Sequence, residues 1–171
     1  MMRRLSLFLT IFATLPVWAA DVPDWVLNPE IPGGIAAAEC VTYTGAISID
    51  RQQGVAAARV ALAQQVGVRV KAVDKLYVER IGSGAKATTQ TSFESASQQL
   101  TDQTLANSRI VKTEIVKHVF GEDRLCVMVA MTPESTQTFF KEMVKVANAN
   151  IPPELENELF ESFRVRERAK P

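Results

Sequence analysis

The chain has no excess of charge of either sign, because its 171 residues include 19 Lys or Arg and 19 Asp or Glu. Nucleic acids and anionic lipid surfaces are usually bound by proteins with a clear surplus of basic residues. Aromatic residues are also few, at 7%, and they do not alternate with basic residues as a nucleic-acid surface would require. We therefore expect neither nucleic acid nor an anionic membrane surface as the main partner.

Residues that carry chemistry are scarce as well. His118 is the only histidine, and no G-x-S-x-G sequence accompanies it, so nothing supports a hydrolytic triad. A zinc site would need this histidine and both cysteines at spacings that differ from those of recognised sites. The acidic residues Asp74, Glu79, Asp102 and Glu114 are not paired by any sequence pattern. We predict a protein that is not an enzyme and has no catalytic residues, cofactor or metal site.

Long apolar runs are missing except at the N-terminus. Arg3 and Arg4 precede an apolar stretch over residues 5–17, and small residues stand at the positions that precede cleavage after Ala19. This stretch is shorter than the roughly 20 residues that span a bilayer. Residues 1–19 are therefore predicted to be a secretory signal peptide, and we expect a bacterial periplasmic protein without a direct membrane span. No cysteine stands at the cleavage site, so lipidation is not expected.

Cysteine occurs only twice, as Cys40 and Cys126. In an exported protein, a disulfide is the default for an isolated pair of cysteines, and two buried free thiols are the alternative. Both residues lie in segments with strand-like alternation, where each side chain would point away from the main core. A bond between them is possible only if the first and the last strand are neighbours in the sheet.

The first half of the exported chain predicts a lead-in, a strand and a helix. Residues 20–39 contain several prolines and glycines, which favour an extended lead-in. Residues 40–49 alternate between apolar and polar side chains and predict a half-buried strand. Asp50 then begins a capping-box-like sequence before an Ala- and Leu-rich helix. This helix either ends at Gly67 or continues through the valines that follow, because the spacing fits both interpretations.

The second half begins with polar segments and continues with a hairpin. Ser, Thr and Gln dominate the middle of the chain, which predicts a loop over residues 83–91 and a weak helix over residues 93–106. Residues 110–120 and 125–132 are rich in β-branched side chains and are separated by Gly121 and polar residues, which predicts a β-hairpin. The second strand of this hairpin is apolar on both faces, as is typical of the centre of a sheet.

Residues 133–171 predict a helical C-terminal extension. Thr132 and Pro133 form a helix start, and Pro153 begins a second helix with an apolar side. The candidate contacts with a partner are Trp25, Leu159, Phe160 and Phe163. The alternatives are that the last helix packs on its own domain and that Trp25 fills the core. Together the elements predict an α+β domain with about three antiparallel or mixed strands.

Several short segments occur in an order that a known family shares. They are Pro23-Asp24-Trp25-Val26 with Asn28-Pro29, Tyr43-x-Gly45, Ala56-Ala57-Ala58-Arg59, Val66-Gly67-Val68-Arg69-Val70 and Cys126 to Ala130. Over residues 21–132 the chain resembles the Lpp-twenty family of small bacterial envelope lipoproteins, which includes flagellar outer-membrane proteins. Family members typically carry a lipidated cysteine at the cleavage site, where this chain has Ala19 and Ala20.

The resemblance implies a compact strand-helix-strand-strand domain of the dodecin-like type over residues 40–132, with no enzymatic activity. It also implies a role in the outer membrane, in motility structures such as the flagellum, or in surface assembly. We therefore expect a self-associating scaffold or assembly protein that is held at the outer membrane by envelope or flagellar partners. Because dodecin-like domains can enclose ligands when they oligomerise, a periplasmic carrier of a small ligand is the alternative function.

Overall fold

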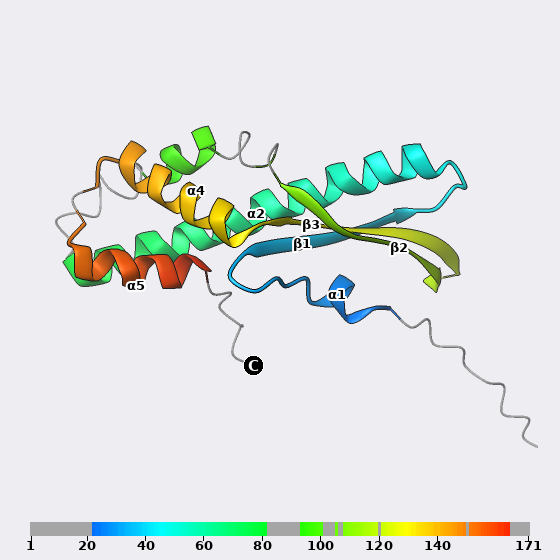
Figure 1. Ribbon diagram of the computed structural model, residues 1–171, viewed down its shortest axis with the longest axis horizontal. Helices are drawn as coiled ribbons and strands as arrows, with labels where there is room; N and C mark the ends of the chain where they lie inside the picture. Colours follow the sequence, from blue (N-terminus) through cyan, green and yellow to red (C-terminus); the bar gives the residue numbers. More distant parts are fainter. Residues whose placement is uncertain are drawn as a thin grey trace, which may run out of the picture.

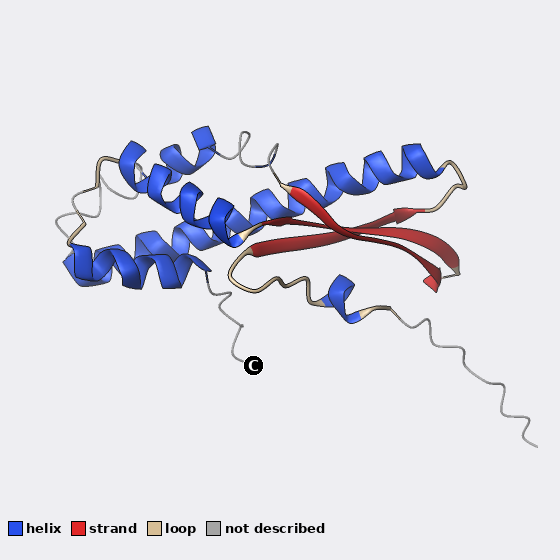
Figure 2. Ribbon diagram, viewed as in Figure 1, coloured by secondary structure: helices blue, strands red, loops and turns tan. Residues whose placement is uncertain are grey.

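A computed structural model describes residues 22–81, 93–100, 105, 108–119, 121–149 and 151–164. The elements are α1 (Asp24–Leu27), β1 (Ile35–Thr42), α2 (Ile47–Ile81), β2 (Arg109–Val119), β3 (Glu122–Met131), α4 (Pro133–Val146) and α5 (Pro153–Arg164), with a further helical segment at residues 93–100. The strands form an antiparallel sheet with the long helix α2 along one face and α1 near the other (Figures 1 and 2). The predicted α+β class with a C-terminal helical part is confirmed.

The sheet has the strand order β1-β3-β2, so the last strand in the sequence lies at its centre. Every residue of β3 from Leu125 to Met131 is buried, which explains why this strand is apolar on both faces. The hairpin turn between β2 and β3 contains Gly121 with a φ of 85°, a conformation that glycine adopts without strain. The predicted hairpin and the central position of its second strand are therefore confirmed.

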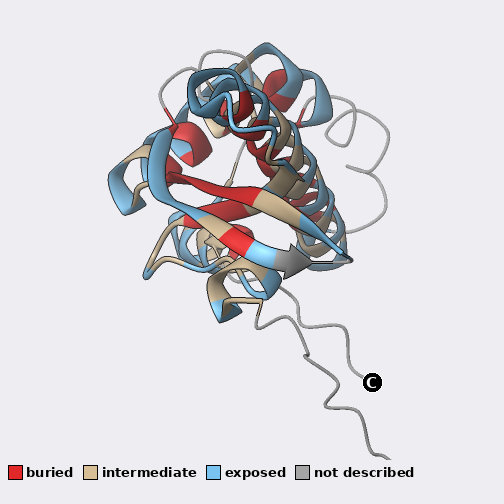
Figure 3. Ribbon diagram, turned by 90° about the vertical axis from the view of Figure 1, so that its right-hand side faces the viewer, coloured by how far each residue is buried: buried red, intermediate tan, exposed pale blue. Residues whose placement is uncertain are grey.

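The two faces of the sheet pack against different partners. Val127, Val129 and Met131 of β3 belong to the large apolar core that α2 and the C-terminal helices complete. Met128 and Ala130 point to the opposite face, where a small second cluster also contains Ala36 and Ala38 of β1. We call the first the inner face and the second the outer face. In Figure 3 the buried residues lie mainly between the sheet and the helices.

The helix α2 is a single element of 35 residues that passes through Gly67. Its buried residues recur at helical spacing from Gly54 to Tyr77 and form the stripe that covers the inner face. A Cβ atom built at Gly67 would meet nothing within 4 Å, so this glycine lies where the helix surface is open. Of the two interpretations left open by the sequence, the continuous helix is the one observed.

The expected strand over residues 40–49 is wrong in its bounds. β1 begins earlier and ends at Thr42, and Ile47 and Ile49 lie in the exposed first turns of α2. A turn intervenes because the buried carboxylate of Asp50 accepts hydrogen bonds from the backbone N–H and the hydroxyl of Thr44, each at 2.9 Å. The apolar alternation of this segment was therefore not a strand signal beyond Thr42, and α2 begins before Asp50.

The C-terminal helices complete the inner core. Thr132 caps α4, because its hydroxyl oxygen accepts a hydrogen bond from the backbone N–H of Ser135 at 3.2 Å. The helix α5 lies beside the C-terminal half of α2 (Figure 1). The guanidinium of Arg69, on α2, donates a hydrogen bond to the backbone oxygen of Phe163 at 3.0 Å and another to that of Arg164. These bonds use carbonyl groups that the end of α5 leaves without helical partners.

The helical segment at residues 93–100 also belongs to the core. Phe93 and Ala96 are buried and Leu100 packs against them, which confirms the apolar face expected for the weak helix. The ring of Phe93 meets the ring of Tyr77 on α2 edge to face, with centroids 5.7 Å apart. The predicted signal peptide at residues 1–19 and the predicted loop at residues 83–91 lie outside the described residues.

Candidate functional site: the outer face and the free edge of the sheet

A disulfide on the outer face joins β1 and β3, the two strands that lie farthest apart in the sequence. Cys40 of β1 and Cys126 of β3 are register partners and are bonded, with Cα atoms 4.0 Å apart and 86 positions between them in the chain. The condition for this bond, adjacent first and last strands, is met because β3 returns to the centre of the sheet. The predicted disulfide is thus present, and the described cysteines include no free thiol.

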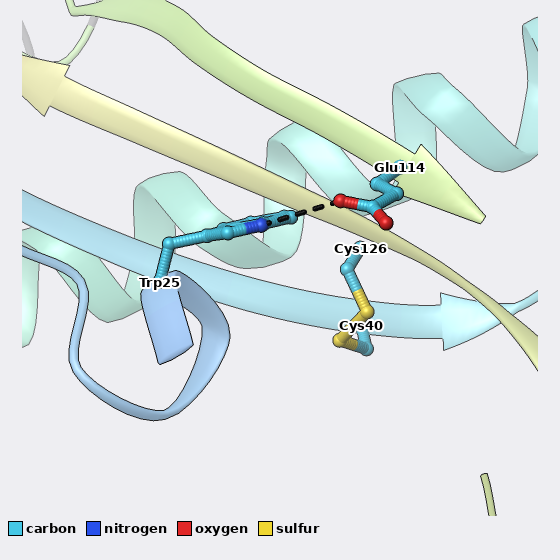
Figure 4. Close-up of a disulfide and its surroundings, with 4 residues drawn as sticks. All are labelled: Trp25, Cys40, Glu114 and Cys126. Atoms are coloured by element: carbon cyan, nitrogen blue, oxygen red, sulfur yellow. Dashed lines mark hydrogen bonds between the residues drawn. A yellow bond between two sulfur atoms is a disulfide. The ribbon is translucent and has the colours of Figure 1, made fainter. Parts of the chain in front are cut away.

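Trp25 lies over the outer face beside this disulfide. Its side chain extends from α1 across β1 toward Glu114 on β2 (Figure 4), and its indole Nε1 donates a hydrogen bond to Oε2 of Glu114 at 3.4 Å. The ammonium of Lys112 lies 5.8 Å from the centre of the indole ring, within the range of a cation–π interaction. Ile31 packs on the same small apolar cluster as Trp25. Trp25 therefore lies half-buried over its own sheet.

The apolar side of α5 is occupied by the chain itself. Leu159 and Phe163 are fully buried, and the ring of Phe163 stacks on Phe139 with centroids 5.7 Å apart. Phe160 is half-buried and its ring lies 5.3 Å from that of Phe140. In this structure Leu159 and Phe163 cannot touch a partner unless α5 detaches, since the inner core holds both. The alternative that α5 packs on its own domain is the observed arrangement.

The edge of β2 is a feature that the sequence analysis missed. Residues 109–114 are all exposed, and they include the apolar Ile110 at 39% and Val111 at 43% exposure. Within the described part of the chain, β2 pairs with β3 alone, so its other side has no strand partner there. An edge strand presents unpaired backbone N–H and C=O groups that can pair with another chain. The adjacent apolar residues Ile110 and Val111 were the available signal.

The acidic residues considered for catalysis are dispersed. Glu114 contacts Trp25, whereas Glu79 is exposed on α2 and forms an ion pair with Lys75 at 3.9 Å. Asp102 lies outside the described residues. His118 belongs to β2, and its side chain is likewise outside them. Within the described part of the chain, no three His, Cys, Asp or Glu side chains gather in a group that could hold a metal ion.

Among the described residues, Asp74 is the one acid whose pKa lies far from its ordinary value. It is buried on α2 and its Oδ1 has no hydrogen-bond partner. Burial raises its pKa from 3.8 to about 7, and the negative charge of Glu94 on the helical segment at residues 93–100 contributes in the same direction. Near Glu94, a hollow of about 540 Å³ lies between this segment and α2. It is lined by Ala63, Gln64, Gly67, Val68, Val70, Lys71, Glu94, Ser97 and Gln98.

No helix among the described residues is both long and apolar enough to cross a membrane. In comparisons with known proteins, the chain matches no family model, no curated protein and no solved structure. The fold alone therefore defines the class of this protein, which is an α+β domain with a disulfide across a three-stranded sheet. The resemblance to the Lpp-twenty family remains a prediction.

Proposed function

We propose that the protein is a non-enzymatic scaffold or assembly protein of the bacterial periplasm that acts by self-association. The observation that carries this proposal is the Cys40–Cys126 disulfide, because such bonds form and persist in oxidising compartments such as the periplasm. The signal-like sequence at residues 1–19 supports the same location. The structure served is an outer-membrane or flagellar assembly, as the family resemblance suggests.

The exposed edge of β2 supports self-association as the mode of action. A long strand with free backbone groups and exposed apolar side chains is the kind of surface that soluble proteins normally protect. On this chain, residues 109–114 are exposed on an edge whose opposite side is fixed to β3. A protein whose work is assembly can use such an edge to pair with a second chain.

Export and self-association are tested together on the full precursor expressed in a bacterium. We expect the purified periplasmic protein to begin at Ala20, to lack the two thiol hydrogens of Cys40 and Cys126 by mass, and to scatter light as an oligomer. A variant that lacks residues 2–19 is the control and should stay in the cytoplasm. An uncleaved cytoplasmic protein with free thiols would contradict the location, and a monomer at all concentrations would contradict the mode of action.

The hollow between α2 and the helical segment at residues 93–100 favours a second function, a small-ligand carrier. Its volume of about 540 Å³ falls within the usual range of roughly 300–1,000 Å³ for ligand sites. Val68 and Val70 supply apolar walls, and Lys71 and Glu94 supply charged groups. Native mass spectrometry of the purified protein tests this function. A co-purifying mass that the exposed Val68→Trp removes from a folded variant supports it, and a bare protein from every preparation contradicts it.

A further inference from the structure

The backbone pattern of the sheet shows which groups of β2 face outward. The N–H of Tyr43, next to β1, donates to the carbonyl of Asp123 at 2.9 Å. Register partners exchange hydrogen bonds at alternate positions along an antiparallel pair. Cys40 and Cys126 lie three positions from the hydrogen-bonded pair of Tyr43 and Asp123, so they form a pair without backbone hydrogen bonds between them. The backbone groups of Cys126 therefore point to β2 instead.

The same alternation then applies to the pairing of β2 with β3. Glu114 is the register partner of Cys126, so the backbone groups of Glu114 point inward to β3. The backbone groups of its neighbours, Thr113 and Ile115, consequently point to the free edge. Irregularities in the register between Ile110 and Lys112 and between Val116 and Val119 restrict the regular stretch to residues 112–116.

Charge disfavours two registers and favours a third for a second copy of the same strand. When two copies of one strand pair in antiparallel fashion, a two-fold axis relates them. At the position of this axis, a residue faces the same residue of the other copy. An axis at Lys112 or at Glu114 places like charges opposite each other, which is destabilising. An axis at Thr113 places Lys112 of each copy opposite Glu114 of the other, so that both cross-strand pairs have opposite charges.

We propose that β2 pairs with β2 of a second copy of this chain, antiparallel, with the two Thr113 residues facing each other. The pairing rests on the proposed function of self-association and specifies its surface. The outward backbone groups of Thr113 and Ile115 supply the hydrogen bonds, and the two Lys112–Glu114 pairs supply the register. The contact is small, so it gives a weak dimer and acts in an assembly where copies are concentrated.

Cysteine cross-linking tests the register in the full exported chain with its native disulfide intact. In a paired dimer, Thr113→Cys brings two thiols to about 5.5 Å between Cα atoms, within reach of a disulfide. The matched control is Val111→Cys on the same strand, because the two copies of that position lie about 13 Å apart in this register. After mild oxidation with copper phenanthroline, we expect about tenfold more covalent dimer from Thr113→Cys than from Val111→Cys.

A charge exchange tests whether the Lys112–Glu114 pairs determine the register, or whether any contact through the exposed edge of β2 gives the cross-link. In the Thr113→Cys background, Lys112→Glu places two acidic residues opposite each other and should lower the yield of cross-linked dimer several-fold. Adding Glu114→Lys restores opposite charges and should restore the yield. Circular dichroism confirms that each variant is folded. A yield that falls with Lys112→Glu and does not recover with the second change overturns the proposed register.

Light scattering of the unmodified chain keeps this inference distinct from the proposed function. An oligomer that gives no preferential Thr113→Cys cross-link overturns β2 pairing and leaves self-association in place. A monomer that gives no cross-link overturns both. A preferential cross-link at Thr113→Cys supports the pairing even where the unmodified dimer dissociates on dilution, because the covalent bond traps a weak contact.

Discussion

The two faces of the sheet are stabilised in different ways. The inner face is covered by α2, α4, α5 and the segment at residues 93–100, and its core contains Leu62, Phe93, Phe140, Leu159 and Phe163, all fully buried. The outer face is covered by a short N-terminal segment, and its cluster consists of Ala36, Met128 and Ala130 with Trp25 and Ile31 against it. One face is held by extensive packing and the other by a few contacts and a disulfide.

The difference explains where a covalent link is useful. Apolar burial contributes roughly 25 cal/mol per Å², so a face lined by alanine gains little from a cover. A disulfide stabilises without burying area, mainly because it restricts the unfolded chain. The bond between Cys40 and Cys126 therefore adds stability on the side where packing can add least. A lightly covered face can also expose Trp25, Lys112 and Glu114 beside the free edge of β2.

Removing the disulfide should have the largest effect. For Cys40→Ala with Cys126→Ala, we expect a loss of about 4 kcal/mol in the free energy of unfolding, because the bond closes a loop of 86 positions. Urea unfolding followed by circular dichroism measures the loss. Wild-type protein treated with a thiol reductant is the control and should show a similar decrease. A decrease below about 1 kcal/mol would show that packing alone fixes the outer face.

The inner side contains a carboxyl group that its packing leaves partly unsatisfied, that of Asp74. Its pKa is about 7 in the folded chain against 3.8 for the ordinary group, so the folded state binds this proton more tightly than the unfolded state. Its contribution to stability is therefore complete at low pH and is lost as the pH rises from 3.8 toward 7. Above that pH both states are ionised and no further loss follows.

Replacing this carboxyl by an amide should remove the pH dependence. Between pH 4 and pH 8 we expect the unfolding free energy of the wild type to fall by about 3 kcal/mol more than that of Asp74→Asn. Urea titrations at the two pH values measure the difference. Glu79→Gln is the matched control on the same helix, since Glu79 is exposed, and should behave as the wild type. Equal pH slopes for Asp74→Asn and the wild type would contradict the assignment.

Two glycines of α2 test how closely the inner face is packed. A Cβ at Gly54 would lie 2.8 Å from Cγ2 of Val127, whereas a Cβ at Gly67 would meet nothing within 4 Å. We expect Gly54→Ala to destabilise the fold by about 2 kcal/mol through overpacking. Gly67→Ala should stabilise it by up to about 1 kcal/mol, since alanine favours the helix. Thermal unfolding compares the two variants, and effects of the same sign would refute the close contact at Gly54.

The sequence predicted best the elements whose signals are local. The hairpin of β2 and β3 was predicted because Gly121 and the β-branched strands lie next to each other in the chain. β1 was misplaced because Ala36 and Ala38 have low strand propensity, and their strand is formed by pairing with distant β3. The same limit applies to α5: an apolar stripe shows that Leu159 and Phe163 are covered, and not whether a partner or the chain itself covers them.

The candidate site was predicted in part for the same reason. The even number of cysteines and the predicted export were enough to predict the bond between Cys40 and Cys126, since this argument needs no coordinates. The contact of Trp25 with Glu114 joins residues that are 89 positions apart, and no local pattern indicates it. The free edge of β2 depends on strand order, which only the assembled sheet reveals.

The smallest effect should come from the cover of the outer face. Trp25→Ala removes a half-buried ring and its hydrogen bond to Glu114, and we expect a loss of about 1 kcal/mol. Leu27→Ala is the matched control on α1, because Leu27 is 63% exposed, and should change stability by less than about 0.5 kcal/mol. Urea unfolding followed by circular dichroism compares them. A loss above about 3 kcal/mol for Trp25→Ala would place this ring in a true core and would remove the contrast between the two faces.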